Sequence, residues 1–181
     1  MPHDAHVAPV LLVKPSLPLI DISGLRSRQL HSRLAVAQEL KAACEQRGFF
    51  YITAHGIAPD VLQHIFVQSQ QLFSLPTVSK SRLDEDAQSS SWIDAPPVPG
   101  TYVVNIGDLM ARWTNGRYHS TLHRVVNVSG RERYSIAFFL TGQPDCEVAC
   151  LPGCLAPGER PRYAPITVEQ HLAECYRRTY A

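Results

Sequence analysis

The hydrophobic pattern in the first half of the chain predicts short strands separated by helices. Apolar residues cluster at 19–22 and again at 49–53, where they are aromatic and β-branched, as is typical of strands. Between these clusters, apolar residues recur at helical spacing and predict a helix over about 33–47. The residues expected along its buried face are Leu34, Ala37, Leu40 and Cys44.

Small and polar residues mark where these elements begin and end. Ser32 is expected to cap the start of the first helix, and Gly48 to end it. The pair His55-Gly56 predicts a turn, in which His55 supports the backbone. Pro59 suits the first turn of a second helix, which we expect to extend to about residue 73.

The pattern changes from helices to strands after a polar segment. The stretch 84–91, DEDAQSSS, predicts a linker or a surface loop. Strand-like apolar runs follow it, separated by Asn-Gly and Ser-Gly turn signals, at 102–106, 122–128 and 134–140. Thr167 and Gln170 form a capping box that predicts a closing helix over about 168–178. Because helices come first and strands follow, the sequence predicts an α+β fold.

Composition narrows the class of protein. A chain of 181 residues, 45% of them hydrophobic, is about one domain and can bury a core. The net charge of +1 gives no reason to expect nucleic acid or a membrane surface as a partner. The apolar run 7–13 is interrupted by Pro9 and is too short to span a membrane. The five cysteines follow no disulfide framework, so we expect a reducing, cytoplasmic setting.

The candidate chemistry lies in the second half of the chain. His123 can hold a metal, although a lone histidine is more often a structural residue. Arg133 and Ser135 point to the same side of the expected strand, where a guanidinium and a hydroxyl can bind a carboxylate. That face continues with Ala137 and Phe139, and an arginine at the head of an apolar face needs a partner. The alternative is a solvent-facing Arg-Ser pair on an outer strand.

Other metal-binding residue types carry weaker signals. His119 is expected at the surface, because on a strand its α-carbon would lie about 13 Å from that of His123. Cys146, Cys150 and Cys154 are four residues apart, but the intervening prolines prevent the regular helix that would bring them together. The large aromatic residues expected in the core are Trp92, Trp113, Phe138 and Phe139.

The segments that carry these motifs resemble a known family. The stretch 92–139, from WIDAPPVPG to RERYSIAFF, is similar to the C-terminal core of the Fe(II)/2-oxoglutarate-dependent dioxygenases, in their isopenicillin N synthase-like branch. The earlier PLIDI, GFFYI and HGI and the later PRYAPIT are similar to the same family. The resemblance divides the chain into an N-terminal leading segment (1–83), a junction (84–91) and a C-terminal oxygenase part (92–181).

The resemblance implies a fold, two cofactors and a reaction. The fold would be a partial double-stranded β-helix, or jelly roll, with flanking helices. Fe(II) and 2-oxoglutarate would be the cofactors, with His123 as the distal iron ligand and Arg133 and Ser135 binding the C5 carboxylate of 2-oxoglutarate. Oxidative decarboxylation of 2-oxoglutarate would be coupled to hydroxylation, desaturation or ring closure of a small organic substrate. We expect His123 and Arg133 to face one shared cleft.

One part of the family pattern is missing from the chain. In the family, a central block carries a His-x-Asp pair that supplies two of the three iron ligands; here none of the eight histidines has Asp or Glu two residues later. No spacing argues for Asp84, Asp86 or Asp94 as a replacement. Two hypotheses therefore stay open. The first is an oxidoreductase. The second is a catalytically inactive remnant, or an incorrectly assembled gene model, that at best binds a ligand or a partner.

Overall fold

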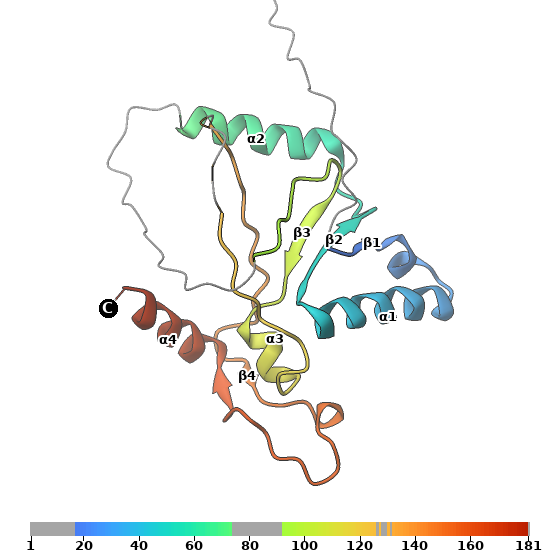
Figure 1. Ribbon diagram of the computed structural model, residues 1–181, viewed down its shortest axis with the longest axis vertical. Helices are drawn as coiled ribbons and strands as arrows, with labels where there is room; N and C mark the ends of the chain where they lie inside the picture. The colour runs from blue at the N-terminus through green and yellow to red at the C-terminus, as the bar shows by residue number, and fades with distance from the viewer. Residues whose placement is uncertain (1–16, 74–91, 126, 128–129, 131, 181) are drawn as a thin grey trace, which may run out of the picture.

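The computed structural model describes residues 17–73, 92–125, 127, 130 and 132–180 (Figure 1). Four α-helices, two 3-10 turns and five short strands follow one another in these residues. Their order is β1 (Leu19–Asp21), η1 (Ser23–Arg26), α1 (Leu30–Gln46), β2 (Phe49–Thr53), α2 (Pro59–Phe73), β3 (Tyr102–Asn105), α3 (Asp108–Trp113), β4 (Glu147–Val148), η2 (Pro152–Cys154), β5 (Ile166–Thr167) and α4 (Val168–Tyr180).

A three-stranded sheet with α1 packed against it forms the larger part of the fold. β2 is the central strand, parallel to β1 and antiparallel to β3. α1 connects β1 to β2, and Figure 1 shows it lying beside the sheet. Buried side chains from α1, β1 and β2 form the core, namely Ile20, Val36, Ala43, Cys44 and Phe50. Helices and this mixed sheet are consistent with the predicted α+β class.

The helix α1 differs from its prediction at its start and in its buried face. It begins at Leu30 with Gln29 as N-cap, and no side chain caps it, so the expectation for Ser32 is wrong. Its buried face centres on Val36 and Ala43, whereas Leu34 is 52% exposed. Apolar residues occupy two sides of this helix, so their spacing alone did not decide which side faces the sheet.

The other elements up to β3 occur where they were expected. β1, β2 and β3 coincide with the predicted apolar clusters to within a residue, and α2 has the predicted bounds. Gly48 ends α1 with a left-handed φ of 66°, and its N–H donates to the Ala43 carbonyl oxygen at 3.1 Å. His55 supports its turn, because its Nδ1 accepts a hydrogen bond from the Ile57 N–H at 3.1 Å.

The C-terminal part contains a two-stranded ribbon and a closing helix. β4 pairs antiparallel with β5, which leads directly into α4. The predicted capping box is confirmed in both directions. The Thr167 N–H donates to Gln170 Oε1 at 3.1 Å, and the Gln170 N–H donates to Thr167 Oγ1 at 3.2 Å. Within the described residues, no helix has the length and apolar character needed to cross a membrane.

The predicted strands at 122–128 and 134–140 are not formed in the described residues of those ranges. Both segments run as long extended traces between the region of α3 and the end of α2 (Figure 1). A strand needs a neighbour for its backbone hydrogen bonds, and the described residues of these segments pair with none of the five strands. An apolar, β-branched sequence predicts the extended shape, but the partner must come from elsewhere in the chain.

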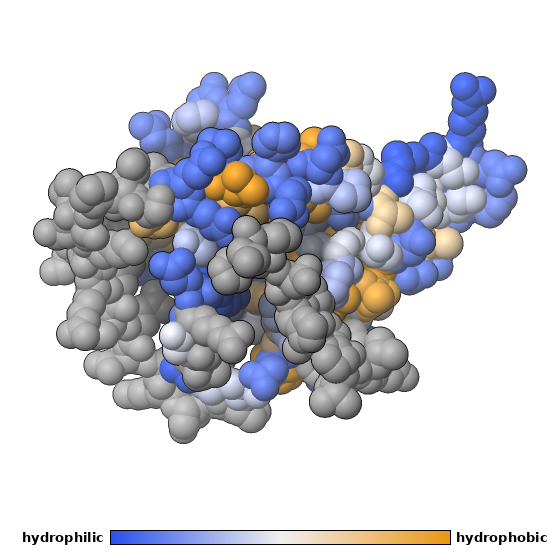
Figure 2. Space-filling view, turned by 90° about the horizontal axis from the view of Figure 1, so that it is seen from above, coloured by the Kyte–Doolittle hydropathy of each residue, from blue (hydrophilic) through white to orange (hydrophobic). Residues whose placement is uncertain are grey.

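The same segments expose side chains that were expected in the core. Phe138, Phe139 and Leu140 are 87%, 84% and 90% exposed, so the core assignment of the two phenylalanines is wrong. Trp92 is also exposed, at 39%. Figure 2, which views the molecule from above, shows apolar surface between the polar side chains. No second sheet in the described part of the chain covers these residues.

Candidate functional site

His123 lies in the extended segment that follows the loop after α3. The preceding residues are bound to the end of α1: the His119 N–H donates to the Cys44 carbonyl oxygen at 3.0 Å, and Thr121 Oγ1 donates to the Arg47 carbonyl oxygen. The His123 ring is exposed and lies edge-on to Phe49, with ring centroids 5.3 Å apart. Its Nδ1 is 3.0 Å from the Thr121 carbonyl oxygen, which leaves Nε2 as the nitrogen available to a ligand.

Arg133 and Ser135 lie in the returning extended segment, and both are exposed. Between them, Tyr134 packs toward the end of α2, with its ring centroid 6.1 Å from that of Phe73. The Tyr134 hydroxyl donates to Glu132 Oε2 at 2.9 Å, and this bond is the main reason that the pKa of Tyr134 is raised. The guanidinium and the hydroxyl are therefore accessible, but they do not stand at the head of a buried apolar face.

The residues present do not fit the three-ligand iron site that the family resemblance implies. Among the described residues, the side chains of three potential ligands gather at one place, where Asp108, His171 and Cys175 lie within 4.8 Å of one another. His123 does not belong to that group. Asp94 is exposed, and Asp84 and Asp86 lie outside the described residues. A single imidazole cannot fix the geometry of an iron ion.

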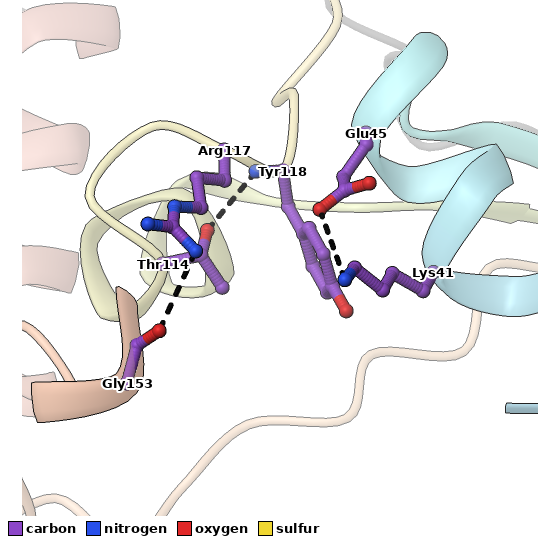
Figure 3. A network of polar contacts seen from close by, with 6 residues as sticks. All are labelled: Lys41, Glu45, Thr114, Arg117, Tyr118 and Gly153. Carbon is purple, nitrogen blue, oxygen red and sulfur yellow. Dashed lines mark hydrogen bonds and ion pairs between the residues drawn. The ribbon is translucent and has the colours of Figure 1, made fainter. Parts of the chain in front are cut away.

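A polar network after α3 positions the start of the His123 segment. The Tyr118 N–H donates to Thr114 Oγ1 at 3.1 Å, and Arg117 donates to the Gly153 carbonyl oxygen at 3.4 Å. Figure 3 shows Tyr118 extending from this turn toward α1, next to the ion pair of Lys41 with Glu45. Burial raises the pKa of the Tyr118 hydroxyl, which keeps the ring neutral in this position.

Asn115 is the central residue of this turn, and the sequence interpretation missed it. Its side chain is 2% exposed and its φ is 55°, in the left-handed region. Nδ2 donates to Glu159 Oε1 at 2.9 Å, and Oδ1 accepts from the Arg162 N–H at 2.8 Å. The Asn-Gly dipeptide was the available signal, because Asn tolerates this conformation better than other side chains. It marked the turn, but the partners far along the chain were not predictable.

The three regularly spaced cysteines of the C-terminal part, Cys146, Cys150 and Cys154, belong to no group of three potential metal ligands in the described residues. Cys150 is close enough to Cys154 that the two thiols interact, and burial raises the pKa of Cys150. The expectation that their regular spacing has no metal role remains a prediction.

Two cavities lie near α4 rather than near His123. One of about 440 Å³ is lined in part by Asp108, Arg112 and His171. The other, of about 650 Å³, is lined in part by Arg112, Arg162 and Gln170. Neither is lined by His123, Arg133 or Ser135. The shared cleft expected between His123 and Arg133 is therefore not one of these cavities.

Two segments of the chain match models of protein families. Residues 64–142 match the model of the 2OG-Fe(II) oxygenase superfamily, and residues 17–97 match that of the N-terminal part of a non-haem dioxygenase in morphine synthesis. Over these two segments the chain is similar to the 2-oxoglutarate–Fe(II) oxygenase superfamily. The two matches together extend from β1 to the end of the returning extended segment.

Individual relatives in this superfamily match about half of the chain. A 2-oxoglutarate-Fe(II) type oxidoreductase of Emericella nidulans is 56% identical over 95 residues, which is 52% of this chain and 27% of the relative. A second oxidoreductase of this type, from Aspergillus fumigatus, is 51% identical over 94 residues, or 52% of this chain and 28% of the relative. The chain thus matches little more than a quarter of the length of these curated relatives.

Solved structures show likeness in fold. A full-length protein of Neurospora crassa, in complex with alpha-KG, superposes with a TM-score of 0.75 at 18% identity, covering 94% of this chain and 98% of that one. A rice dioxygenase for auxin oxidation superposes with a TM-score of 0.71 at 18% identity, covering 90% and 95%. At these identities the likeness supports the fold alone.

Proposed function

We propose that the protein derives from an Fe(II)/2-oxoglutarate-dependent oxidoreductase of small organic molecules and that this chain, as it stands, does not turn over 2-oxoglutarate. The family matches and the oxidoreductase relatives support the first statement. The second statement, that the chain does not turn over 2-oxoglutarate, rests on His123. This residue is exposed and, among the described residues, belongs to no group of three potential ligands. We place the protein in the cytoplasm, in keeping with its cysteine content.

The architecture behind this proposal is a partial jelly roll. We propose that residues 1–83 form the leading segment of the family, that 84–91 are the junction, and that 92–181 are the C-terminal part of the oxygenase. The exposed side chains of Phe138 and Phe139 support this proposal. In a complete jelly roll, a facing sheet would cover an extended apolar segment of this kind.

The residues proposed to bind the co-substrate are Arg133 and Ser135, with His123 as a remaining iron ligand. Their accessibility supports the proposal, because a guanidinium and a hydroxyl two residues apart can reach one carboxylate from solvent. Anchoring a carboxylate stabilises the ground state and the transition state alike, so it gives no rate enhancement by itself.

The catalytic proposal is tested by measuring succinate. The purified chain is incubated with Fe(II), ascorbate and 2-oxoglutarate beside its His123→Ala variant, and we expect neither to form succinate above the protein-free background. Succinate that forms with the natural sequence and disappears in His123→Ala would overturn the proposal. It would also show that other residues complete an iron site.

The binding proposal needs a separate measurement. Calorimetric titration with 2-oxoglutarate, without metal, is compared between the natural sequence, Arg133→Ala and the matched control Arg160→Ala, which removes another exposed arginine. We expect weak binding that Arg133→Ala abolishes and Arg160→Ala preserves. Equal binding by all three proteins would show that Arg133 does not bind 2-oxoglutarate.

A further inference from the structure

A second cluster of ligand-type side chains lies between α3 and α4, away from His123. Asp108 stands in the first turn of α3, and His171 and Cys175 are one helical turn apart on α4. One ligand atom from each of the three lies within 4.8 Å of the others. A carboxylate, an imidazole and a thiolate are the three protein ligand types that Zn²⁺ takes.

The spacing of two of these ligands matches tetrahedral zinc. His171 Nε2 is 3.6 Å from Cys175 Sγ. Zinc bonds of about 2.0–2.1 Å to nitrogen and about 2.3 Å to sulfur, at a tetrahedral angle, place those two atoms about 3.6 Å apart. The separation on α4 is therefore already that of two ligands on one ion, without movement of the helix.

The burial of His171 is an independent observation that points to a ligand. The residue is only 6% exposed, yet its Nδ1 has no hydrogen-bond partner among the described groups. Its other nitrogen has a thiol as partner, which is a weak hydrogen-bonding group. An ion at Nε2 replaces this weak thiol contact with a coordination bond, whereas the missing partner of Nδ1 is a separate feature of the site. Burial also lowers the pKa of His171, which favours the neutral ring that a metal needs.

The guanidinium of Arg178 marks the position that a cation takes in this cluster. Its Nη2 lies 3.2 Å from Cys175 Sγ and 3.9 Å from Asp108 Oδ2. The Arg178 side chain is 71% exposed, so it can leave without disturbing the core. In its present place it acts as a competitor for a metal.

We propose that Asp108, His171 and Cys175 bind a Zn²⁺ ion, which displaces the Arg178 guanidinium. The cavity of about 440 Å³ that Asp108, His171 and Arg178 help to line adjoins this position. A fourth ligand, water or a small anion, enters from that cavity, and the nearby Arg112 and Arg177 favour an anion. This site goes beyond the proposed 2-oxoglutarate chemistry and does not depend on it.

The test uses the full chain and Co²⁺, which takes the same ligands as Zn²⁺ and gives a thiolate-to-metal charge-transfer band. We expect one Co²⁺ per chain, a charge-transfer band, and its loss when Zn²⁺ is added. Cys175→Ser abolishes the band, and Asp108→Asn weakens binding by more than about 100-fold, beyond the 10- to 100-fold of outer-shell changes. Cys154→Ser, a matched control for an unrelated thiol, keeps the band.

The variant Arg178→Gln tests whether the cluster binds a metal or has a structural role alone. Removing the competing guanidinium tightens metal binding several-fold if the ion occupies its place, whereas a merely structural arginine gives no gain. A band that persists in Cys175→Ser, binding that is unchanged in Asp108→Asn, or no Co²⁺ binding at all would each overturn the proposal. The side chains of Asp108 and Arg178 are exposed and Cys175 is partly exposed, and a circular dichroism spectrum checks that each variant is folded.

Discussion

The α-carbon of Gly48 faces the carbonyl oxygen of His119, so closely that a Cβ at position 48 would overlap that oxygen. Hydrogen bonds fix the approach on both sides. The His119 N–H donates to the Cys44 carbonyl oxygen at 3.0 Å, and the Ile106 N–H donates to the Gly48 carbonyl oxygen at 2.7 Å. Gly48 thus ends α1, begins the turn into β2 and contacts the backbone of the segment that leads to His123.

Gly48→Ala should destabilise the fold through two separate effects. The left-handed φ of 66° strains any side chain, and the new methyl group collides with the His119 backbone, which cannot move independently. We expect a loss of about 2–4 kcal/mol in the free energy of unfolding, measured in urea. Gly100→Ala is the matched control, because φ there is 73° and nothing lies within 4 Å. A control loss as large as that of Gly48→Ala would show that the backbone conformation alone matters.

The capping box of α4 should contribute measurably to helix stability. Thr167→Ala removes the acceptor for the Gln170 N–H and leaves that donor without its partner. We expect a loss of about 0.5–2 kcal/mol, together with fraying of α4 that hydrogen exchange detects at the first turn. Thr167→Ser keeps the hydroxyl and should retain most of the stability. If Ser and Ala are equally harmful, the methyl group rather than the hydroxyl is responsible.

Substituting two phenylalanines, one buried and one exposed, tests which residues form the core. Phe50 is 3% exposed at the centre of the sheet, and Phe50→Ala should cost about 3–5 kcal/mol. Phe139 is 84% exposed, so Phe139→Ala should change the free energy of unfolding by less than about 0.5 kcal/mol. Urea titrations of both variants give the comparison. A large cost at Phe139 would mean that the extended segment is packed in solution.

Asn115 should be more important than its place in a loop suggests. Asn115→Ala leaves the Arg162 N–H without its acceptor, removes one of the two donors to the Glu159 carboxylate and puts alanine at a φ of 55°. We expect a loss of about 2–4 kcal/mol in thermal or urea unfolding. Asn115→Gly restores the backbone freedom but not the hydrogen bonds, so its loss should be smaller. An equal loss in both variants would assign the whole effect to the hydrogen bonds.

Local chemistry explains which parts of the fold were predictable from the sequence. The Gly48 helix end and the Thr167–Gln170 box each depend on atoms within a few residues, and both occur as predicted. The extended segment of Phe139 was predictable in shape but not in burial, because a strand is completed by a distant partner. Asp108 and His171 lie close together because of how α4 is placed relative to α3, and no local sequence pattern predicts that placement.

His171 should make stability depend on pH. Burial, followed by the Arg112 guanidinium, lowers its pKa below the ordinary 6.5, against the opposing effect of Asp108 and Glu174. The unfolded chain takes up a proton near pH 6.5, whereas the folded chain does so only at lower pH. Between these two values the unfolded state binds more protons, so stability is full above about pH 6.5 and falls as the pH decreases toward the folded pKa.

The measurement is urea unfolding at several pH values between about 7.5 and 5.5, the range around the ordinary histidine pKa, with a chelator present to exclude metals. We expect the natural sequence to lose stability over this range and His171→Asn, which does not titrate, to lose less. His31→Gln, at an exposed position of α1, controls for removal of a histidine and should keep the full pH dependence. If His171→Asn retains the natural pH dependence, the destabilising proton binds elsewhere, and the buried imidazole is not the group that titrates.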